Sequence, residues 1–236
     1  MAESKKFKTI AIIGAMREEI TPLLEHFKDY ESIEKGGNTF YKITHKSHSS
    51  IIIAYSKIGK IHAALTCATM ILHFGAECII FSGVAGGLRA DLKVGDIILA
   101  TALCQYDVDI SAFGHPLGFI PESKIYIKTS ANLNAIAQGI AKEQGIDLKE
   151  GIVASGDSFI SDNSKKGWIM EQFNAAAVEM EGASIAVVAS LLSVPFCVIR
   201  SISDSADDSA NISFDEFLEH SAQKSAKFVL AILDKM

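Results

Sequence analysis

Short apolar runs alternate with longer helical patterns along the chain, and this alternation constrains the fold more than any other feature. Several of the short runs are apolar at every position, which is typical of strands that helices cover on both faces. The predicted strands are Thr9–Ile13, Thr39–Ile43, Ile51–Tyr55, Cys78–Phe81, Asp96–Ala102, Gly151–Ala154, Ala177–Met180 and Phe196–Ile202. The predicted helices are Glu18–Phe27, Gly59–Phe74, Asn132–Glu143, Ser164–Phe173, Gly182–Leu192 and Ser213–Asp234. The alternation predicts a layered α/β architecture.

The composition is that of a folded protein with a large core. Of the 236 residues, 49% are hydrophobic and 21% are charged, and there are only 4 prolines. We find no internal repeat, low-complexity tract or interdomain linker, so we expect residues 1–236 to form one domain. The formal net charge is −6, and the longest basic cluster is the pair Lys165-Lys166. Nucleic-acid binding needs clustered lysine and arginine, so we expect no nucleic-acid partner.

Cysteine usage and the absence of a signal pattern favour a reducing, cytoplasmic location. Cys67, Cys78, Cys104 and Cys197 are scattered among apolar residues and form no C-x-x-C pair, so we expect reduced core thiols. The start of the sequence is polar and lacks the apolar stretch of a secretory signal. The uncharged segment 182–199 is long enough to raise the question of a membrane span, but Pro195 interrupts it. It is predicted as a buried helix followed by a buried strand.

Acidic residues follow three of the predicted strands. Glu19 comes soon after the first strand, Glu179 and Glu181 lie at the end of another, and Arg200 and Asp204 lie at the end of the last. Each has a simpler interpretation taken alone: an acid that favours a helix dipole, a solvated strand end, or a local ion pair. Their joint occurrence at strand ends predicts a binding site for a polar ligand.

Other motifs narrow the possible chemistry. The segment Ser82–Gly87 is either a tight turn or a ligand loop, and it lacks the pattern of a P-loop or a dinucleotide fingerprint. There is no Gly-x-Ser-x-Gly elbow and no H-E-x-x-H spacing among the histidines, so we expect neither a hydrolase triad of that type nor a transition-metal site. The irregular stretch 106–124 is a candidate binding loop. Ser213 and Glu216 predict a capping box at the start of the last helix.

Seven blocks in a fixed order resemble the 5′-methylthioadenosine/S-adenosylhomocysteine nucleosidases of the purine nucleoside phosphorylase superfamily. The blocks are residues 12–19 (IIGAMREE), 56–60 (SKIGK), 83–87 (GVAGG), 155–160 (SGDSFI), 178–181 (VEME), 200–204 (RSISD) and 213–217 (SFDEF). The resemblance implies a three-layer α/β/α fold with a central mixed, twisted sheet. Residues 15–22, 81–87 and 112–123 look most like a bacterial subgroup that also cleaves 6-amino-6-deoxyfutalosine in the futalosine route to menaquinone.

The resemblance implies a hydrolase that releases adenine from 5′-substituted adenosines. It makes Asp204 the acid that engages N7 and the exocyclic amine, Glu19 the group that orients the attacking water, and Glu181 the partner of the ribose hydroxyls. An acid can protonate the leaving base at neutral pH only if its pKa is raised, and an apolar pocket favours that. A second carboxylate near the ribose offsets the developing oxocarbenium charge. Arg200 is implied to tune Glu19 or Asp204.

The same resemblance supplies the rest of the site. Phe159 is implied to stack on the base, the Ile160 backbone to read its edge, and the Met180 backbone to lie beside the ribose. Phe113 and Pro121 are implied to enter from a second subunit, hence a homodimer whose loop 106–124 reaches the neighbouring site. The other implied binding residues are Met16, Ile58, Val84, Ser203 and Phe214, and no metal or organic cofactor is implied.

Two departures and two alternatives stay open. Val84 stands where many family members carry serine, and His115 replaces an aromatic residue of the loop from the neighbouring subunit. One alternative is a nucleoside phosphorylase. The glycine-rich segment 83–87 lacks a neighbouring basic pair to bind phosphate, but Arg89 lies close to it in the sequence, so this alternative stays open. The other is a non-catalytic nucleoside-binding protein on the same fold.

Overall fold

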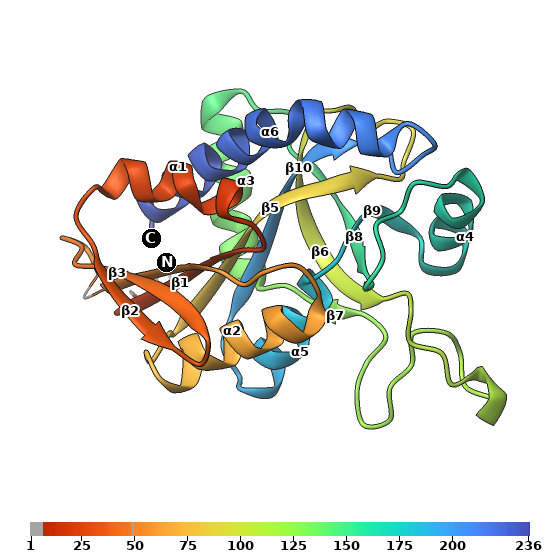
Figure 1. Ribbon diagram of the computed structural model, residues 1–236, viewed down its shortest axis with the longest axis horizontal. Helices are drawn as coiled ribbons and strands as arrows, with labels where there is room; N and C mark the ends of the chain where they lie inside the picture. The colour runs from red at the N-terminus through yellow and green to blue at the C-terminus, as the bar shows by residue number, and fades with distance from the viewer. Residues whose placement is uncertain (1–6, 49) are drawn as a thin grey trace.

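The computed structural model describes residues 7–48 and 50–236, and strands and helices alternate along them as expected (Figure 1). The strands are β1 (Thr9–Gly14), β2 (Glu31–Lys35), β3 (Asn38–Ile43), β4 (Ser50–Tyr55), β5 (Cys78–Gly87), β6 (Ile97–Gln105), β7 (Ile127–Lys128), β8 (Lys149–Ser155), β9 (Ala175–Glu179) and β10 (Phe196–Asp204). The helices are α1 (Arg17–Phe27), α2 (Lys60–Leu72), α3 (Ala131–Gln144), α4 (Asn163–Phe173), α5 (Gly182–Leu191) and α6 (Ala210–Leu233), with a 3-10 turn at Ser111–Phe113.

The strands form one mixed sheet, which partly closes on itself. Its order is β10-β6-β8-β9-β5-β1-β4-β3-β2, and β10 also pairs with β5, so β5, β10, β6, β8 and β9 make a closed ring. β1 runs parallel to β4 and β5, and β10 runs parallel to β5, whereas β9 is antiparallel to β5. The expected mixed sheet within an α/β fold is confirmed.

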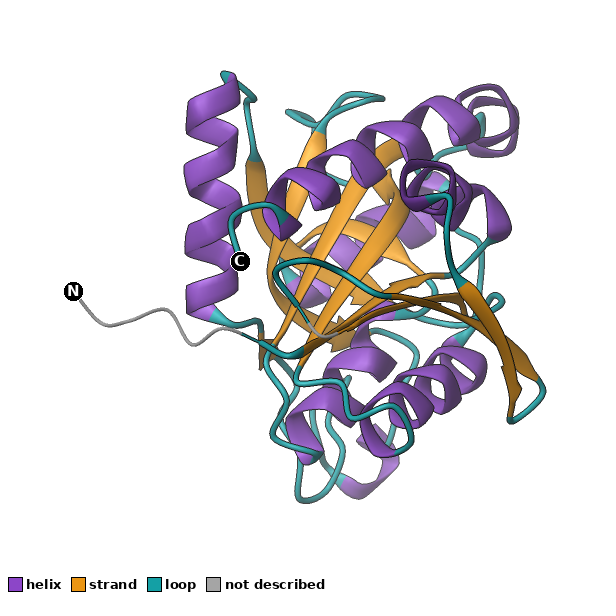
Figure 2. Cartoon of the chain, turned by 90° about the vertical axis from the view of Figure 1, so that its left-hand side faces the viewer, coloured by secondary structure: helices purple, strands orange, loops and turns teal. Residues whose placement is uncertain are grey.

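Helices cover both faces of this sheet (Figures 1 and 2). α1, α3 and α6 pack on one face, where their apolar side chains share a core with Ile10, Ile12 and Ile199. α2 and α5 pack on the other face, over a core that includes Ala11 and Phe81. Because successive residues of a strand point to opposite faces, the continuously apolar strands serve both cores at once. α4 lies apart, over a third cluster near β8 and β9.

The glycine-rich segment after Phe81 belongs to a strand, and this corrects the predicted end of that strand. β5 continues to Gly87, where Gly83 pairs with Arg200 of β10 and Gly86 pairs with Val178 of β9. The segment is therefore neither a tight turn nor a detached loop. A β-carbon on Gly83 would meet Arg200 Nη1 at 2.2 Å and Glu19 Oε1 at 2.3 Å, so only glycine lets these charged groups approach the strand.

The other differences are local. β2 and β7 were not predicted, because β2 has mostly exposed, charged residues and β7 is two residues long. The predicted capping box is wrong: α6 begins at Ala210, so Ser213 is already inside the helix and its N–H bonds the Ser209 carbonyl at 3.1 Å. All four cysteines are free and buried, as expected. Within the described residues, no helix has both the length and the apolar character needed to cross a membrane.

Candidate active site

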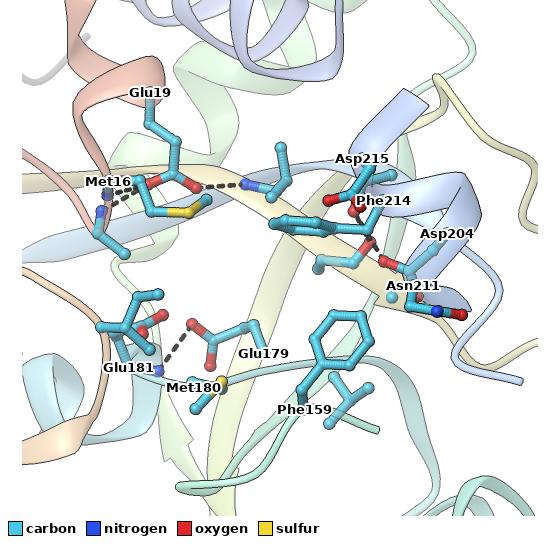
Figure 3. A pocket seen from close by; sticks show the side chains of 17 residues that line it. Met16, Glu19, Phe159, Glu179, Met180, Glu181, Asp204, Asn211, Phe214 and Asp215 are labelled. Atoms are coloured by element: carbon cyan, nitrogen blue, oxygen red, sulfur yellow. Dashed lines mark hydrogen bonds between the residues drawn. The ribbon is translucent and has the colours of Figure 1, made fainter. Parts of the chain in front are cut away.

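A cavity of about 430 Å³ opens where β1, β5, β9 and β10 end, and the three acids singled out from the sequence all face it (Figure 3). Glu19 comes from the first turn of α1, Glu181 precedes α5, and Asp204 ends β10. The lining residues are Ala15, Met16, Glu19, Ile58, Val84, Ala85, Gly86, Phe159, Val178, Glu179, Met180, Glu181, Ser203, Asp204, Asn211, Phe214 and Asp215. The structure thus brings strand-end acids that are distant in sequence into one pocket.

Glu19 is held almost entirely by main-chain donors. Its carboxylate accepts hydrogen bonds from the N–H groups of Ala15 (2.5 Å), Met16 (3.0 Å) and Val84 (2.9 Å). Burial raises the pKa of Glu19, while Arg200 and these N–H groups act in the opposite direction. The Val84 side chain lines the cavity beside it, so this position offers an apolar surface and a backbone donor, not a hydroxyl.

A buried ion-pair network lies behind the cavity. Arg200 Nη2 pairs with Glu179 and lies 3.9 Å from Glu181 Oε2, and its guanidinium stacks 3.7 Å above the Phe81 ring. Glu179 also accepts bonds from the Ser155 hydroxyl and from the Gly182 N–H. Such a network fixes its members, because a buried charge without its partner is costly.

Glu181, like Glu179, belongs to this network and lines the cavity. Its Oε1 accepts a hydrogen bond from the Gly59 N–H at 2.8 Å, which ties it to the start of α2. Burial, followed by the neighbouring Glu179, raises the pKa of Glu181 to about 8, and Arg200 partly offsets the rise. Burial and a like charge both favour the protonated form of a carboxyl group, so these two causes act against the pairing with Arg200.

Asp204 is held differently. Its Oδ1 accepts a bond from the Ala206 N–H and its Oδ2 from the Ser203 hydroxyl, both at 2.8 Å. Burial raises the pKa of Asp204, while these two bonds and the Lys166 charge lower it. The ion pairs of Arg200 within the described residues join it to Glu179 and Glu181, so it does not pair with Asp204. Of the two partners expected for Arg200, Glu19 has its pKa lowered by the Arg200 charge.

The remaining candidates divide into those that face the cavity and those that do not. Met16, Ile58, Val84, Phe159, Met180, Ser203 and Phe214 line it. Phe159 packs edge-on against Phe214, with ring centroids 5.5 Å apart. Ile160 is buried next to Phe159 without lining the cavity. Phe113 and Pro121 lie on the surface outside it, and Phe113 is 81% exposed.

Sequence reasoning missed three polar participants. Glu179 was noted only as lying with Glu181 at the end of a strand, yet it is the direct partner of Arg200. Asn211 and Asp215 line the cavity from the first turns of α6. Their spacing with Phe214 places all three on one helix face, a signal that was lost because the helix was expected to begin at Ser213. Within residues 7–48 and 50–236, no group of three or more His, Cys, Asp or Glu side chains is arranged to hold a metal ion.

Comparisons with known proteins agree with this fold. Residues 9–234 match the model of the phosphorylase superfamily. An aminodeoxyfutalosine nucleosidase of Helicobacter pylori is 57% identical over 228 residues, covering 96% of this chain and 99% of its own. A 5′-methylthioadenosine/S-adenosylhomocysteine nucleosidase of an Exiguobacterium species is 37% identical over 229 residues, covering 96% and 98%.

A solved structure gives the same result in three dimensions. The native futalosine hydrolase of Helicobacter pylori superposes with a TM-score of 0.96 at 56% identity, covering 99% of this chain and 100% of its own. Identity at this level over nearly the whole length of both chains confirms the resemblance found in the sequence. The chain belongs to the family of 5′-methylthioadenosine/S-adenosylhomocysteine and aminodeoxyfutalosine nucleosidases within the phosphorylase superfamily.

Proposed function

We propose that the protein hydrolyses the N-glycosidic bond of 5′-substituted adenosines and releases adenine. The substrates proposed are 5′-methylthioadenosine, S-adenosylhomocysteine, 5′-deoxyadenosine and 6-amino-6-deoxyfutalosine. The observation that carries the proposal is the placement of buried carboxyl groups around one cavity, with Glu19 and Glu181 toward one end and Asp204 toward the other (Figure 3). A nucleoside bound between them has Asp204 next to its base and the carboxyl groups of Glu19 and Glu181 next to its sugar.

Each carboxyl group has a distinct task in this reaction. Cleavage of the C1′–N9 bond leaves negative charge on adenine and positive charge on the ribosyl ring. Asp204, whose pKa burial raises, donates a proton to N7 and so stabilises the leaving base. Glu19 holds the attacking water near the anomeric carbon, and its negative charge offsets the oxocarbenium charge. Glu181 accepts hydrogen bonds from the ribose hydroxyls, with the Met180 backbone beside it.

Apolar groups divide the rest of the cavity between the base and the 5′ substituent. Phe159, which lines the cavity, stacks on adenine. The backbone of Ile160, which follows Phe159 and lies outside the lining of the cavity, is assigned to read the edge of the base. Met16, Ile58 and Phe214 surround the 5′ substituent. The large apolar lining suits substituents that differ in size, since dispersion and burial do not require a fixed pattern of polar partners.

Hydrolysis fits the cavity better than phosphorolysis. None of the described side chains that line it is a lysine or an arginine, and a phosphate co-substrate needs such donors. Arg89, which kept this alternative open, pairs with Asp91 and the Glu150 carbonyl at the surface. Arg200 does not line the cavity and is paired with Glu179, so it is not placed to bind a phosphate.

We also propose that the protein acts as a homodimer in which loop 106–124 reaches the neighbouring site. Phe113 exposes 81% of its surface, and Ile61 and Leu191, on the adjacent helices α2 and α5, expose 80% and 77%. Large apolar side chains exposed on this loop and on these helices support the proposal that a second subunit covers them. Sedimentation of the wild type and of Ile61→Asp tests this: the variant is expected to shift toward monomer and to lose activity.

The function is tested by adenine release in phosphate-free buffer. The wild type is expected to release adenine from 5′-methylthioadenosine without phosphate, and Asp204→Asn to lower kcat by about a thousandfold or more, because its amide cannot protonate N7. Strict dependence on phosphate would indicate a phosphorylase. Binding of 5′-methylthioadenosine without any turnover by the wild type would indicate a binding protein, and full activity of D204N would refute the role of Asp204.

A further inference from the structure

α4 is tied to the loop that follows Asp204. Lys166 Nζ donates a hydrogen bond to the Ser205 carbonyl at 2.5 Å. One turn earlier on the helix, Asn163 Nδ2 donates to Asp208 Oδ2 at 2.7 Å. The loop between β10 and α6 is therefore anchored to a helix that contributes no side chain to the lining of the cavity.

The geometry of this loop sets the orientation of the Asp204 carboxyl group. Ala206 adopts a left-handed backbone conformation, with φ of 50°, which is costly for a residue with a β-carbon. In this conformation its N–H donates to Asp204 Oδ1 at 2.8 Å. The strand beneath leaves little room, because a β-carbon on Gly86 would meet Asp204 Oδ1 at 2.8 Å and Ala206 Cβ at 3.0 Å. The Ser205 carbonyl bonded by Lys166 belongs to the peptide unit that contains this N–H.

The charges around Asp204 give Lys166 a second effect. Asp207, on the same loop, raises the pKa of Asp204, whereas Lys166 lowers it. Asp215 adds another carboxylate on the α6 side of the cavity. Lys166 therefore acts against burial and acidic neighbours, and removing it would favour the protonated form of Asp204.

We propose that Lys166 is a positioning residue for the base end of the site, which locks the Ser205-Ala206 turn so that Asp204 is aimed at the substrate. The proposal rests on the proposed function, since it gives Lys166 a task through the acid. Lys166 touches no reacting atom, and its contribution is a fixed backbone carbonyl and a nearby positive charge.

The neighbouring lysine provides a matched control. Lys165 lies over the Trp168 ring at 3.9 Å from its centroid and over the Tyr106 ring at 5.6 Å. It has the same charge and length as Lys166, and the bond to Ser205 comes from Lys166. Lys165→Met therefore removes a lysine from the same helix turn without removing the anchor.

The test compares kcat, KM and the pH profile of kcat for the wild type, K166M, K166R and K165M. K166M is expected to lower kcat by about tenfold and to keep KM within about twofold of the wild type. The reason is that an Asp204 carboxyl no longer held in place affects the chemical step more than binding. The alkaline limb of its kcat profile is expected to move to higher pH, since loss of the lysine charge raises the pKa of Asp204. K166R keeps a charged donor and should stay within about threefold of the wild type, and K165M should match the wild type.

Three outcomes decide the matter. The expected split between K166M and K165M, with rescue by K166R, supports the proposal. Identical kcat values and pH profiles for K166M and K165M overturn it, and so does a K166M variant whose defect is confined to KM or to thermal stability. D204N distinguishes failure of this proposal from failure of the proposed function. If D204N is inactive and K166M has the kcat of the wild type, only the role of Lys166 is refuted. If D204N is fully active, the acid assignment falls as well.

Discussion

The two ends of the cavity hold their carboxyl groups by different means. At the ribose end, Glu179 and Glu181 share the buried guanidinium of Arg200, and Glu19 accepts three main-chain hydrogen bonds. At the base end, Asp204 has one main-chain bond and one hydroxyl bond, and Lys166, which bonds the Ser205 carbonyl, lowers its pKa through charge alone. One end is a charged network built into the sheet, whereas at the other end Asp204 closes a strand that leads into a turn and has no cation paired with it directly among the described residues.

This difference matches what each end has to do in the proposed reaction. Groups that stabilise developing positive charge and hold a water act best when they are already in place before the substrate binds. An acid that gives up a proton needs a pKa that allows both protonation states near working pH, and each nearby cation lowers that pKa. The acids at the ribose end are therefore held by more partners than Asp204, the proton donor at the base end.

The largest expected effect comes from removing the centre of the network with Arg200→Met. Glu179 and Glu181 would then be left buried without their cation, which typically costs about 3–5 kcal/mol in the free energy of unfolding. Urea unfolding measures this change. Arg89→Met is the control, because the Arg89–Asp91 pair is exposed and should contribute less than about 1 kcal/mol. A loss for R200M no larger than that for R89M would contradict the contrast between the two ends.

A smaller effect is expected in the pH dependence of stability. The pKa of Glu181 rises to about 8 in the folded protein from an ordinary value of 4.5, so between these limits the folded state binds the proton that the unfolded state has released. Stability is therefore fully present below the unfolded pKa and falls as pH rises, by up to about 1.4 kcal/mol per pH unit for one such group. The raised pKa values of Glu19 and Asp204 act in the same direction.

The variant Glu181→Gln measures how much this acid contributes to the pH dependence of the free energy of unfolding. Unfolding free energies at about pH 5.5, 6.5 and 7.5 should fall less steeply for E181Q than for the wild type. Glu143→Gln, at an exposed pair with Lys235, should keep the slope of the wild type. An unchanged slope in E181Q would mean that Arg200 keeps the Glu181 carboxyl ionised over this pH range, so that burial does not raise its pKa above the range of a paired carboxylate.

Most of the layered fold could be predicted from the sequence, because several of its strands are apolar throughout and helix breakers mark where some elements end. Pro195 is an example: α5 ends at Leu191 and β10 begins at Phe196, on either side of it. The same reasoning stopped β5 too early. Glycine is disfavoured in strands on average, and the reason for it here is the approach of Glu19 and Arg200, which come from other elements.

The site was only partly predictable for a related reason. Glu19, Glu181 and Asp204 stand out because each follows a strand, and strand ends meet at one edge of a sheet. The partners of Arg200 were not predictable, since local order suggested Asp204, four residues away, whereas the register of β10 points Arg200 at Glu179. Side-chain direction within a strand alternates with every residue, so a pairing between strands depends on register that no local pattern reveals.

The smallest expected effect concerns the apolar side of the base end and is tested by Phe159→Leu. Phe159 is 46% exposed and packs edge-on against Phe214, so the free protein loses little stability when the ring is removed. The bound base loses a stacking surface worth about 1 kcal/mol, which corresponds to a rise in KM of roughly fivefold. Tyr30→Leu is the matched control, because Tyr30 is 42% exposed and packs edge-on against Tyr41 outside the cavity. A larger fall in kcat than rise in KM would show that Phe159 also aligns the base with Asp204, and the base end would then be more tightly organised than its few polar bonds indicate.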